Sequence, residues 1–165
     1  MVNGDDVFND LAKRRKYKIL PANKDDKINF ITHRLKGIST KGKEVAFTVL
    51  LRRQMNPSKY SDNWGWVEFW SKRPTERSEG RTGWLYGKAH FVAFETSKCF
   101  LIVSSKSLLH FLNTSSKVRY DLPFVNEPKY ARYRILRDGR GRESTQVNYR
   151  DIKKINGVKI WNKDK

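Results

Sequence analysis

Residues that could cross-link the chain or bind transition metals are scarce. The sequence contains one cysteine, Cys99, and three scattered histidines, His33, His90 and His110. An internal disulfide is therefore excluded, and no Cys/His spacing suits a zinc site. Cys99 lies in the apolar run CFLIV, so we expect a buried, small hydrophobic side chain in a protein of a reducing compartment.

Long hydrophobic runs are also missing. No stretch approaches the roughly 18 apolar residues of a membrane span, and the N-terminus lacks the apolar segment of a signal peptide. Phosphate-binding Gly-Lys-Ser/Thr loops and Gly-x-Ser-x-Gly nucleophile turns do not occur either. We expect a soluble, intracellular protein without a membrane partner, and these common catalytic motifs are excluded.

Negative charge is in short supply. The chain has 35 Lys and Arg against 17 Asp and Glu, a formal net charge of +18, which is more than solubility requires. Residues 1–60 and 111–165 each carry 14 basic against 6 acidic side chains, whereas 61–110 carry 7 against 5. A polyanion is the expected partner, because neutralising phosphates releases their condensed counterions. We therefore predict binding to nucleic acid, either DNA or RNA.

One main domain is predicted. At 165 residues the chain can bury a single core. We divide it into a helix and lead-in over 1–21, the main domain over 22–158, and a frayed basic tail over 159–165. The helix is predicted over 5–16 from the apolar face that Val7, Phe8 and Leu11 share. The basic run KRRKYK at its end is either a solvated face or a contact with nucleic acid.

Alternating and β-branched apolar residues predict mostly strands in the main domain. The predicted strands cover 28–36, 44–53, 64–72, 89–95, 99–104 and 129–137. A helix begins after Ser104 or Ser105 as N-cap, with Leu108 and Leu112 facing inward. DGRG at 138–141 predicts a hairpin turn. The expected fold is mixed α/β, with a central, mostly β sheet.

The strand at 64–72 presents an unusual aromatic face. Its alternation places Trp64, Trp66, Glu68 and Trp70 on one side, opposite Val67 and Phe69. Three tryptophans on one face are costly to leave in water. Two interpretations remain open, a surface that packs against the rest of the protein or a platform on which bases stack.

Basic residues gather in three regions that suit phosphate contacts. These are the end of the second predicted strand, the charged loop at 72–81, and the segment 132–142. Like charges as close as Arg137, Arg140 and Arg142 repel each other, and a bound phosphate would relieve the repulsion. The predicted nucleic-acid-binding residues are Arg52, Arg53, Lys72, Arg73, Arg77, Arg81, Lys88, Arg132, Arg134, Arg137, Arg140 and Arg142.

Four segments resemble one nuclease-fold family. They are WVEF at 66–69, GWLYGKAHFVAFE at 83–95, CFLIVSSKSLLHFL at 99–112 and the Tyr- and Arg-rich stretch at 130–155. Together they are similar to the PD-(D/E)XK nuclease-fold proteins of phages and large viruses, over about 22–155 and best over 66–112. The resemblance implies a restriction-endonuclease-like central sheet flanked by helices. For a viral protein it also implies a location in the host cytoplasm or the virion.

The family's catalytic positions are occupied here by residues of another type. In such nucleases an Asp on one strand and an Asp-x-Lys on the next hold Mg²⁺ and orient the attacking water. Aligned to that pattern, Thr32 (or the nearby Asn29) replaces the first Asp, Thr48 the second, and Leu50 the Lys. Glu68 matches the family's Glu. The resemblance therefore implies a pseudoenzyme that binds nucleic acid without cutting it and needs no cofactor.

Two other functions stay open. An active, Mg²⁺-dependent endonuclease could have moved its metal ligands, for instance by combining Glu68 with Asp62 or Glu44. A domain that has lost its activity could also serve as a basic structural subunit of a ribonucleoprotein or virion.

Overall fold

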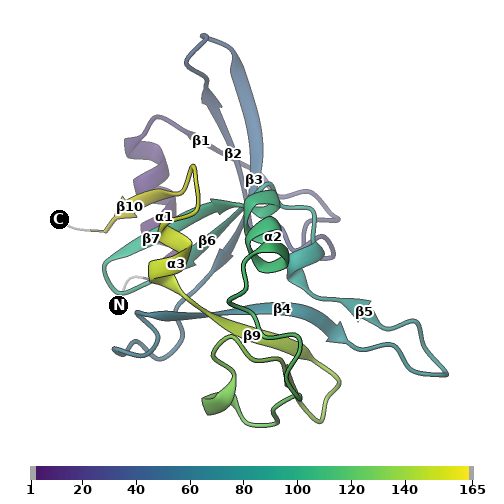
Figure 1. Cartoon of the computed structure of the whole chain (residues 1–165). Helices are drawn as coiled ribbons and strands as arrows, with labels where there is room; N and C mark the ends of the chain where they lie inside the picture. The colour runs from purple at the N-terminus through teal and green to yellow at the C-terminus, as the bar shows by residue number, and fades with distance from the viewer. Residues whose placement is uncertain (1–2, 164–165) are drawn as a thin grey trace.

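The computed structural model describes residues 3–163 and places ten strands of this range in two sheets (Figure 1). The larger sheet contains, in spatial order, β1 (Lys18–Leu20), β2 (His33–Ile38), β3 (Glu44–Arg52), β6 (Phe91–Glu95), β7 (Cys99–Ser104) and β10 (Lys159–Asn162). The smaller contains β5 (Arg81–Thr82), β4 (Trp64–Lys72), β9 (Glu143–Asn148) and β8 (Leu136–Arg137). Only the β3–β6 pair within these sheets is parallel. The predicted mixed α/β class is confirmed.

Helices lie on both faces of the larger sheet. Helix α1 (Gly4–Arg14) packs on one face. On the other lie α2 (Ser105–Thr114), α3 (Tyr149–Lys153) and the smaller sheet. The predicted cap is confirmed, since Ser104 accepts a hydrogen bond from the Ser107 amide at 3.0 Å. Two 3₁₀ turns, η1 (Trp84–Tyr86) and η2 (Pro128–Tyr130), complete the elements of this range. None of its helices has the length and apolar character needed to cross a bilayer.

Strand β3 separates two hydrophobic cores. Leu50 faces the core shared with α2, α3 and the smaller sheet, whereas Val49 and Leu51 face the core beneath α1. Successive side chains of a strand point to opposite faces. A strand buried on both faces therefore shows the continuous apolar run VLL in place of alternation.

Strand β4 has the predicted alternation up to Phe69, whereas Trp70, predicted to share the face of Trp64 and Trp66, packs partly buried against the core instead. Val67 and Phe69 are buried in the core, whereas Trp64, Trp66 and Glu68 are half-buried on the opposite face. The strand pairs with β9 from Trp64 opposite Asn148, and the register shifts between Glu68 and Trp70. The aromatic face thus lies along an open side of the smaller sheet.

The predicted strand over 129–137 is wrong for most of its length. Only Leu136–Arg137 forms a strand, and Tyr133 has a left-handed backbone with φ of 54°. Two anchors overrule the local alternation. The Tyr133 hydroxyl binds the carboxylate of Asp151, and the Arg134 guanidinium donates to the Pro123 carbonyl at 2.8 Å.

The segment from residue 159 is also different from its expected state. It was predicted to be frayed, yet Lys159–Asn162 forms β10, which pairs antiparallel with β7. Trp161 explains the pairing, because its buried ring stacks on Phe8 of α1 with centroids 5.3 Å apart. The last two residues of the predicted tail, 164–165, lie outside the described range.

Candidate nucleic-acid interface

The three positions that the nuclease-fold resemblance aligns with catalytic residues do not meet in an open cleft. The Thr32 hydroxyl donates to the Val49 carbonyl at 3.1 Å and accepts from the Leu51 amide at 2.7 Å. The Thr48 hydroxyl accepts from the His90 amide at 3.1 Å. Leu50 is 5% exposed within the core. Two of these side chains thus join strands and the third packs inside, so none of them faces a substrate.

The carboxylates that could have replaced those ligands are separated. Within residues 3–163, no three His, Cys, Asp or Glu side chains gather in a group suited to a metal ion. Asp62 accepts hydrogen bonds from the Gln54 side chain and the Ser97 amide, both at 2.7 Å. Glu44 forms an ion pair with Lys36 at 2.7 Å. Glu68 lies elsewhere, beside arginines.

Two adjoining hollows run along the aromatic face of β4. One has a volume of about 300 Å³ and the other about 290 Å³, and both are lined by Arg52 and Trp66. The first continues to Trp64, and the second continues to Glu68 and Arg142. We call this composite hollow the β4 groove. Its principal side chains are Arg52, Trp64, Trp66, Glu68, Trp84 and Arg142.

Local sequence explains how the groove forms. Arg52 is the last residue of β3 and shares the strand face of Leu50, which is turned toward β4. Trp84 follows Gly83, where a side chain would lie only 2.4 Å from the Glu68 carbonyl oxygen. Glycine therefore lets η1 approach β4 closely, and the Arg52 guanidinium carbon then lies 5.2 Å from the centre of the Trp84 ring.

The charges in the groove are unequal in number. Burial raises the pKa of Glu68, against the opposing effect of Arg52, Arg142, the Trp84 backbone amide and Arg81. Burial likewise lowers the pKa of Arg52, while Glu68 and Tyr149 act to raise it. Although neighbouring atoms crowd the Arg52 side chain, it is exposed to solvent through the two open hollows that it lines. Several guanidinium groups thus lie around the Glu68 carboxylate, while the two other carboxylates of the hollows are paired, Asp138 with Arg142 and Glu95 with Lys163.

Aromatic rings and arginines alternate along one end of the groove. The guanidinium carbon of Arg132 lies 4.7 Å from the Trp64 ring centre and 5.0 Å from that of Tyr60. Both rings line the groove. A flat cation above aromatic rings is a geometry that nucleobases can share or replace, since each base offers a π-face.

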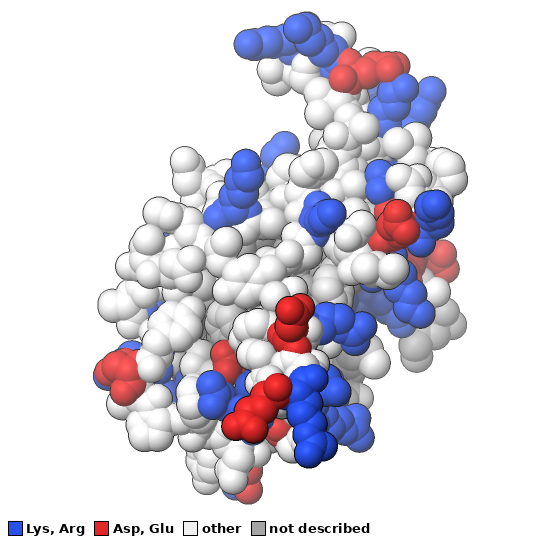
Figure 2. Space-filling model, turned by 90° about the vertical axis from the view of Figure 1, so that its right-hand side faces the viewer, with Lys and Arg blue, Asp and Glu red and all other residues white. Residues whose placement is uncertain are grey.

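The structure brings two of the three predicted basic regions together. The Arg73 amide donates to the Gly141 carbonyl at 2.7 Å, which places the 72–81 loop against the 138–142 turn. Arg81 lies on β5, whose register places it opposite Lys72. The basic side chains at this end of the molecule are Lys72, Arg73, Arg77, Arg81, Arg140 and Arg142. Figure 2 shows the side where β4 and β5 end, with Lys and Arg intermingled with Asp and Glu.

Several predicted contact residues have partners within the protein. Arg137 binds Glu143 at 2.9 Å and lies 3.4 Å from the Phe124 ring centre, and Arg142 pairs with Asp138 at 3.3 Å. The like-charge repulsion expected in this turn is therefore largely relieved by carboxylates, without a bound phosphate. Arg53 pairs with Asp5 at 3.2 Å.

Two further predicted residues lie apart from the groove. Arg134 anchors the 123–125 loop through the Pro123 carbonyl. Lys88 lines a different hollow, beside Val45 and Phe91. The predicted set thus divides into groove residues, neighbours of the groove, and residues that stabilise loops.

Sequence reasoning overlooked several groove residues. Tyr60 lies in a polar loop, and Tyr149 begins α3, so neither belonged to a basic cluster. Trp84 was recognised only as part of GWLYG. Its buried indole Nε1 has no hydrogen-bond partner within residues 3–163. The flanking glycines were the available signal, because an aromatic residue between glycines indicates close backbone packing.

Comparison with known proteins adds no relative. Protein-family models, curated proteins and solved structures each give no match to the chain. The nuclease-fold resemblance therefore stays a prediction, and the function is argued from the geometry of the chain's own residues.

Proposed function

We propose that this protein binds nucleic acid in the β4 groove and does not cleave it. The observation that supports the proposal most strongly is the position of Arg52. Its guanidinium reaches solvent between two hollows, close to the Trp84 ring and on the groove wall shared with Trp66. A cation flanked by aromatic rings can neutralise a phosphate while the neighbouring bases stack.

The groove favours unpaired bases. In a duplex the faces of the bases are already stacked on each other, whereas bases of a single strand can turn toward Trp64 and Trp66. The backbone would then follow Arg52 and Arg142 toward the basic loop at 72–81. We therefore expect single-stranded DNA or RNA to bind more tightly than a duplex of equal length.

The proposed relationship to PD-(D/E)XK nucleases agrees with binding alone. Hydroxyl groups occupied in strand pairing at Thr32 and Thr48 provide no negative charge for Mg²⁺, and Leu50 cannot stabilise the charge that develops on a phosphate. A pseudoenzyme of this family keeps the grip on the backbone and loses the chemistry.

Fluorescence anisotropy with labelled 20-mers tests the proposal directly. We expect the affinity for single strands to fall as salt is raised. The slope of log affinity against log salt should be about −3, as four or five phosphate contacts give. Incubation of plasmid and single-stranded substrates with Mg²⁺ or Mn²⁺ should leave them intact. Metal-dependent cleavage that disappears in Glu68→Ala would support the nuclease alternative. Absence of binding together with co-sedimentation in a large particle would support the structural subunit.

The variant Glu68→Gln separates binding from catalysis. Removing the Glu68 carboxylate, which unlike Asp138 and Glu95 forms no ion pair within residues 3–163, should strengthen single-strand binding about fivefold, since roughly 1 kcal/mol of repulsion from a nearby phosphate is lost. A metal-binding Glu68 would give the opposite result, namely weaker metal-dependent activity and no gain in affinity. Asp10→Asn, which changes the same charge at an exposed position of α1 on the other face of the larger sheet, serves as the control.

The pKa of Glu68 adds a second measurement on the same variant. Because burial raises the folded-state pKa above the ordinary 4.5, the favourable contribution of protonation is complete below 4.5 and is lost as pH rises through the folded pKa. Glu68→Gln, which stays neutral, should therefore raise the free energy of unfolding at pH 7. This gain should shrink as the pH is lowered toward 4.5, as urea titrations at a series of pH values would show.

A further inference from the structure

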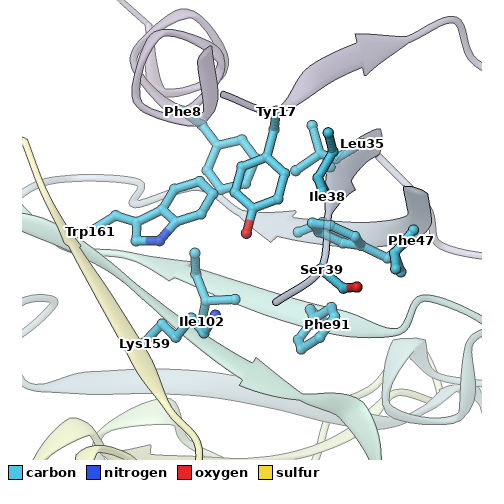
Figure 3. A pocket seen from close by; sticks show the side chains of 13 residues that line it. Phe8, Tyr17, Leu35, Ile38, Ser39, Phe47, Phe91, Ile102, Lys159 and Trp161 are labelled. Carbon is cyan, nitrogen blue, oxygen red and sulfur yellow. The ribbon is translucent and has the colours of Figure 1, made fainter. Parts of the chain in front are cut away.

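A separate hollow lies on the face of the larger sheet that carries α1 (Figure 3). It has a volume of about 250 Å³, and aromatic and aliphatic side chains form most of its wall. Helix α1 covers the end of this face near Leu51 and Phe100 and leaves the end near Phe47 and Phe91 uncovered. We call this hollow the aromatic cup. Its principal side chains are Phe8, Tyr17, Phe47, Phe91, Lys159 and Trp161.

The curl of the larger sheet forms the cup. Tyr17, just before β1, stacks on Trp161 of β10 with ring centres 5.9 Å apart, although these strands are the two edges of the sheet. Phe8 closes the bottom by stacking on Trp161. Gly37 lets Tyr17 lie across β2, because a Cβ at that position would lie 2.5 Å from the Tyr17 ring.

The mouth of the cup exposes apolar surface. Ile38 is 74% exposed and Val45 is 44% exposed, and both line the hollow. They belong to the β2–β3 hairpin, which projects from the body at the top of Figure 1. Phe47 and Phe91 continue the apolar wall inward, in a T-shaped pair with centres 5.4 Å apart. Contiguous apolar surface of this kind, open to water, indicates a binding site.

Few polar groups reach the cup, and their chemistry limits the ligand. The Tyr17 hydroxyl projects toward the centre of the cup (Figure 3), and within residues 3–163 it has no hydrogen-bond partner. Lys159 lines the hollow and forms no ion pair within the same range. The Ser39 hydroxyl accepts from the amides of Lys41 and Lys43, both at 3.3 Å. The site therefore offers one unpaired cation and one free hydroxyl in apolar surroundings.

We propose that the aromatic cup binds a small anionic amphiphile, with an apolar body of about eight to ten carbons inside and a carboxylate beside Lys159. The size agrees, because a cavity of roughly 150 Å³ accepts benzene and this one is larger. A nucleobase fits poorly, since most of the donors and acceptors on its edge would lose water without gaining a partner. The cup and the β4 groove lie on opposite faces of the sheet, so this proposal does not depend on nucleic-acid binding.

Calorimetric titration of the whole chain with octanoate, octanol and octylamine tests the proposal. The three ligands share one chain and differ in the charge of the head. We expect octanoate to bind at least tenfold more tightly than octylamine, with octanol between them. Methyl resonances of Leu35, Val49 and Ile102 should shift on titration, because these side chains line the cup.

Two variants locate the binding. Lys159→Gln should remove the preference for octanoate over octanol while leaving octanol binding unchanged, and Lys153→Gln, on α3, should leave both unchanged. Val49→Phe should fill the cup and abolish binding of all three ligands. If that variant does not fold, the comparison of Lys159→Gln with Lys153→Gln still decides.

Three results would overturn the proposal. They are equal affinity for octanoate and octylamine, shifts confined to residues outside the cup, and no binding at millimolar octanoate. Displacement of octanoate by thymidine monophosphate would instead identify the cup as a base-binding site. Loss of single-strand binding in groove variants, with octanoate binding retained, would show that the two sites bind their ligands independently.

Discussion

Replacing Arg52 by glutamate is expected to weaken single-strand binding about 100-fold at about 0.1 M salt, where the screening length is about 10 Å. Arg52 lines both hollows of the β4 groove, so a phosphate backbone that follows the groove from one hollow to the other would lie close to its guanidinium. Reversing the charge removes one attraction and adds one repulsion, each worth roughly 1.4 kcal/mol in a partly desolvated site. Anisotropy titrations of the wild-type chain and the variant, at the same salt concentration, would measure the difference.

A matched variant makes the result specific. Arg14→Glu changes the net charge by the same amount at an exposed position in the last turn of α1, on the far side of the larger sheet. We expect no more than about a threefold loss there, because screening weakens an exposed charge beyond about 10 Å. Equal losses in the two variants would mean that only the overall charge attracts nucleic acid, and the groove would then not be the binding site.

The more conservative Arg52→Lys examines the role of the flat guanidinium. Lysine keeps the charge but cannot lie over the Trp84 ring in the same way. We expect the single-strand affinity of Arg52→Lys to lie between those of the wild-type chain and Arg52→Glu. The salt slope should be unchanged, because the number of cations is unchanged.

Replacing Trp161 by alanine is expected to lower the free energy of unfolding by about 3–5 kcal/mol, as for other buried large aromatic residues. Trp161 is 6% exposed, stacks on Phe8 and Tyr17, and has the Arg15 guanidinium 4.8 Å from its ring centre. Its loss would separate the two edges of the curled sheet from each other and from α1. Urea unfolding followed by circular dichroism would give the difference from the midpoint and slope.

The neighbouring residue supplies the control for this prediction. Asn162 lies on the same strand but is exposed, so Asn162→Ala should change the free energy of unfolding by less than about 0.5 kcal/mol. A frayed segment after residue 158 would give small effects for both variants, and that outcome would contradict the pairing of β10 with β7.

The larger sheet would thus carry two unrelated kinds of recognition. On one side, arginines and tryptophans line a groove suited to a polyanion, and on the other, aromatic rings line an apolar cup with one lysine at its wall. The alternation of β3 makes this possible, since Arg52 points to the groove side while Phe47 and Val49 point to the cup. A single strand therefore contributes to both.

Sequence alone determined those features that depend on neighbouring residues. The apolar faces of α1 and α2, the cap of α2, the alternation of β4 up to Phe69 and the hairpin at 138–141 all follow from a repeat of 3.6 or 2 residues, or from capping and turn chemistry. The excess of positive charge was equally plain. These signals involve only neighbouring residues, so they can be recognised in a single sequence.

Tertiary structure decided which of these features meet. It brought Arg52 to Trp84 across more than thirty residues, paired Arg137 with Glu143, overruled the alternation before β8 and joined the C-terminal segment to β7. Such pairings depend on loop closure and on the fit of distant faces, and many partners are compatible with one local pattern. Positive residues could therefore be counted in the sequence, but only the folded chain separates those that face an open groove from those that hold its loops together.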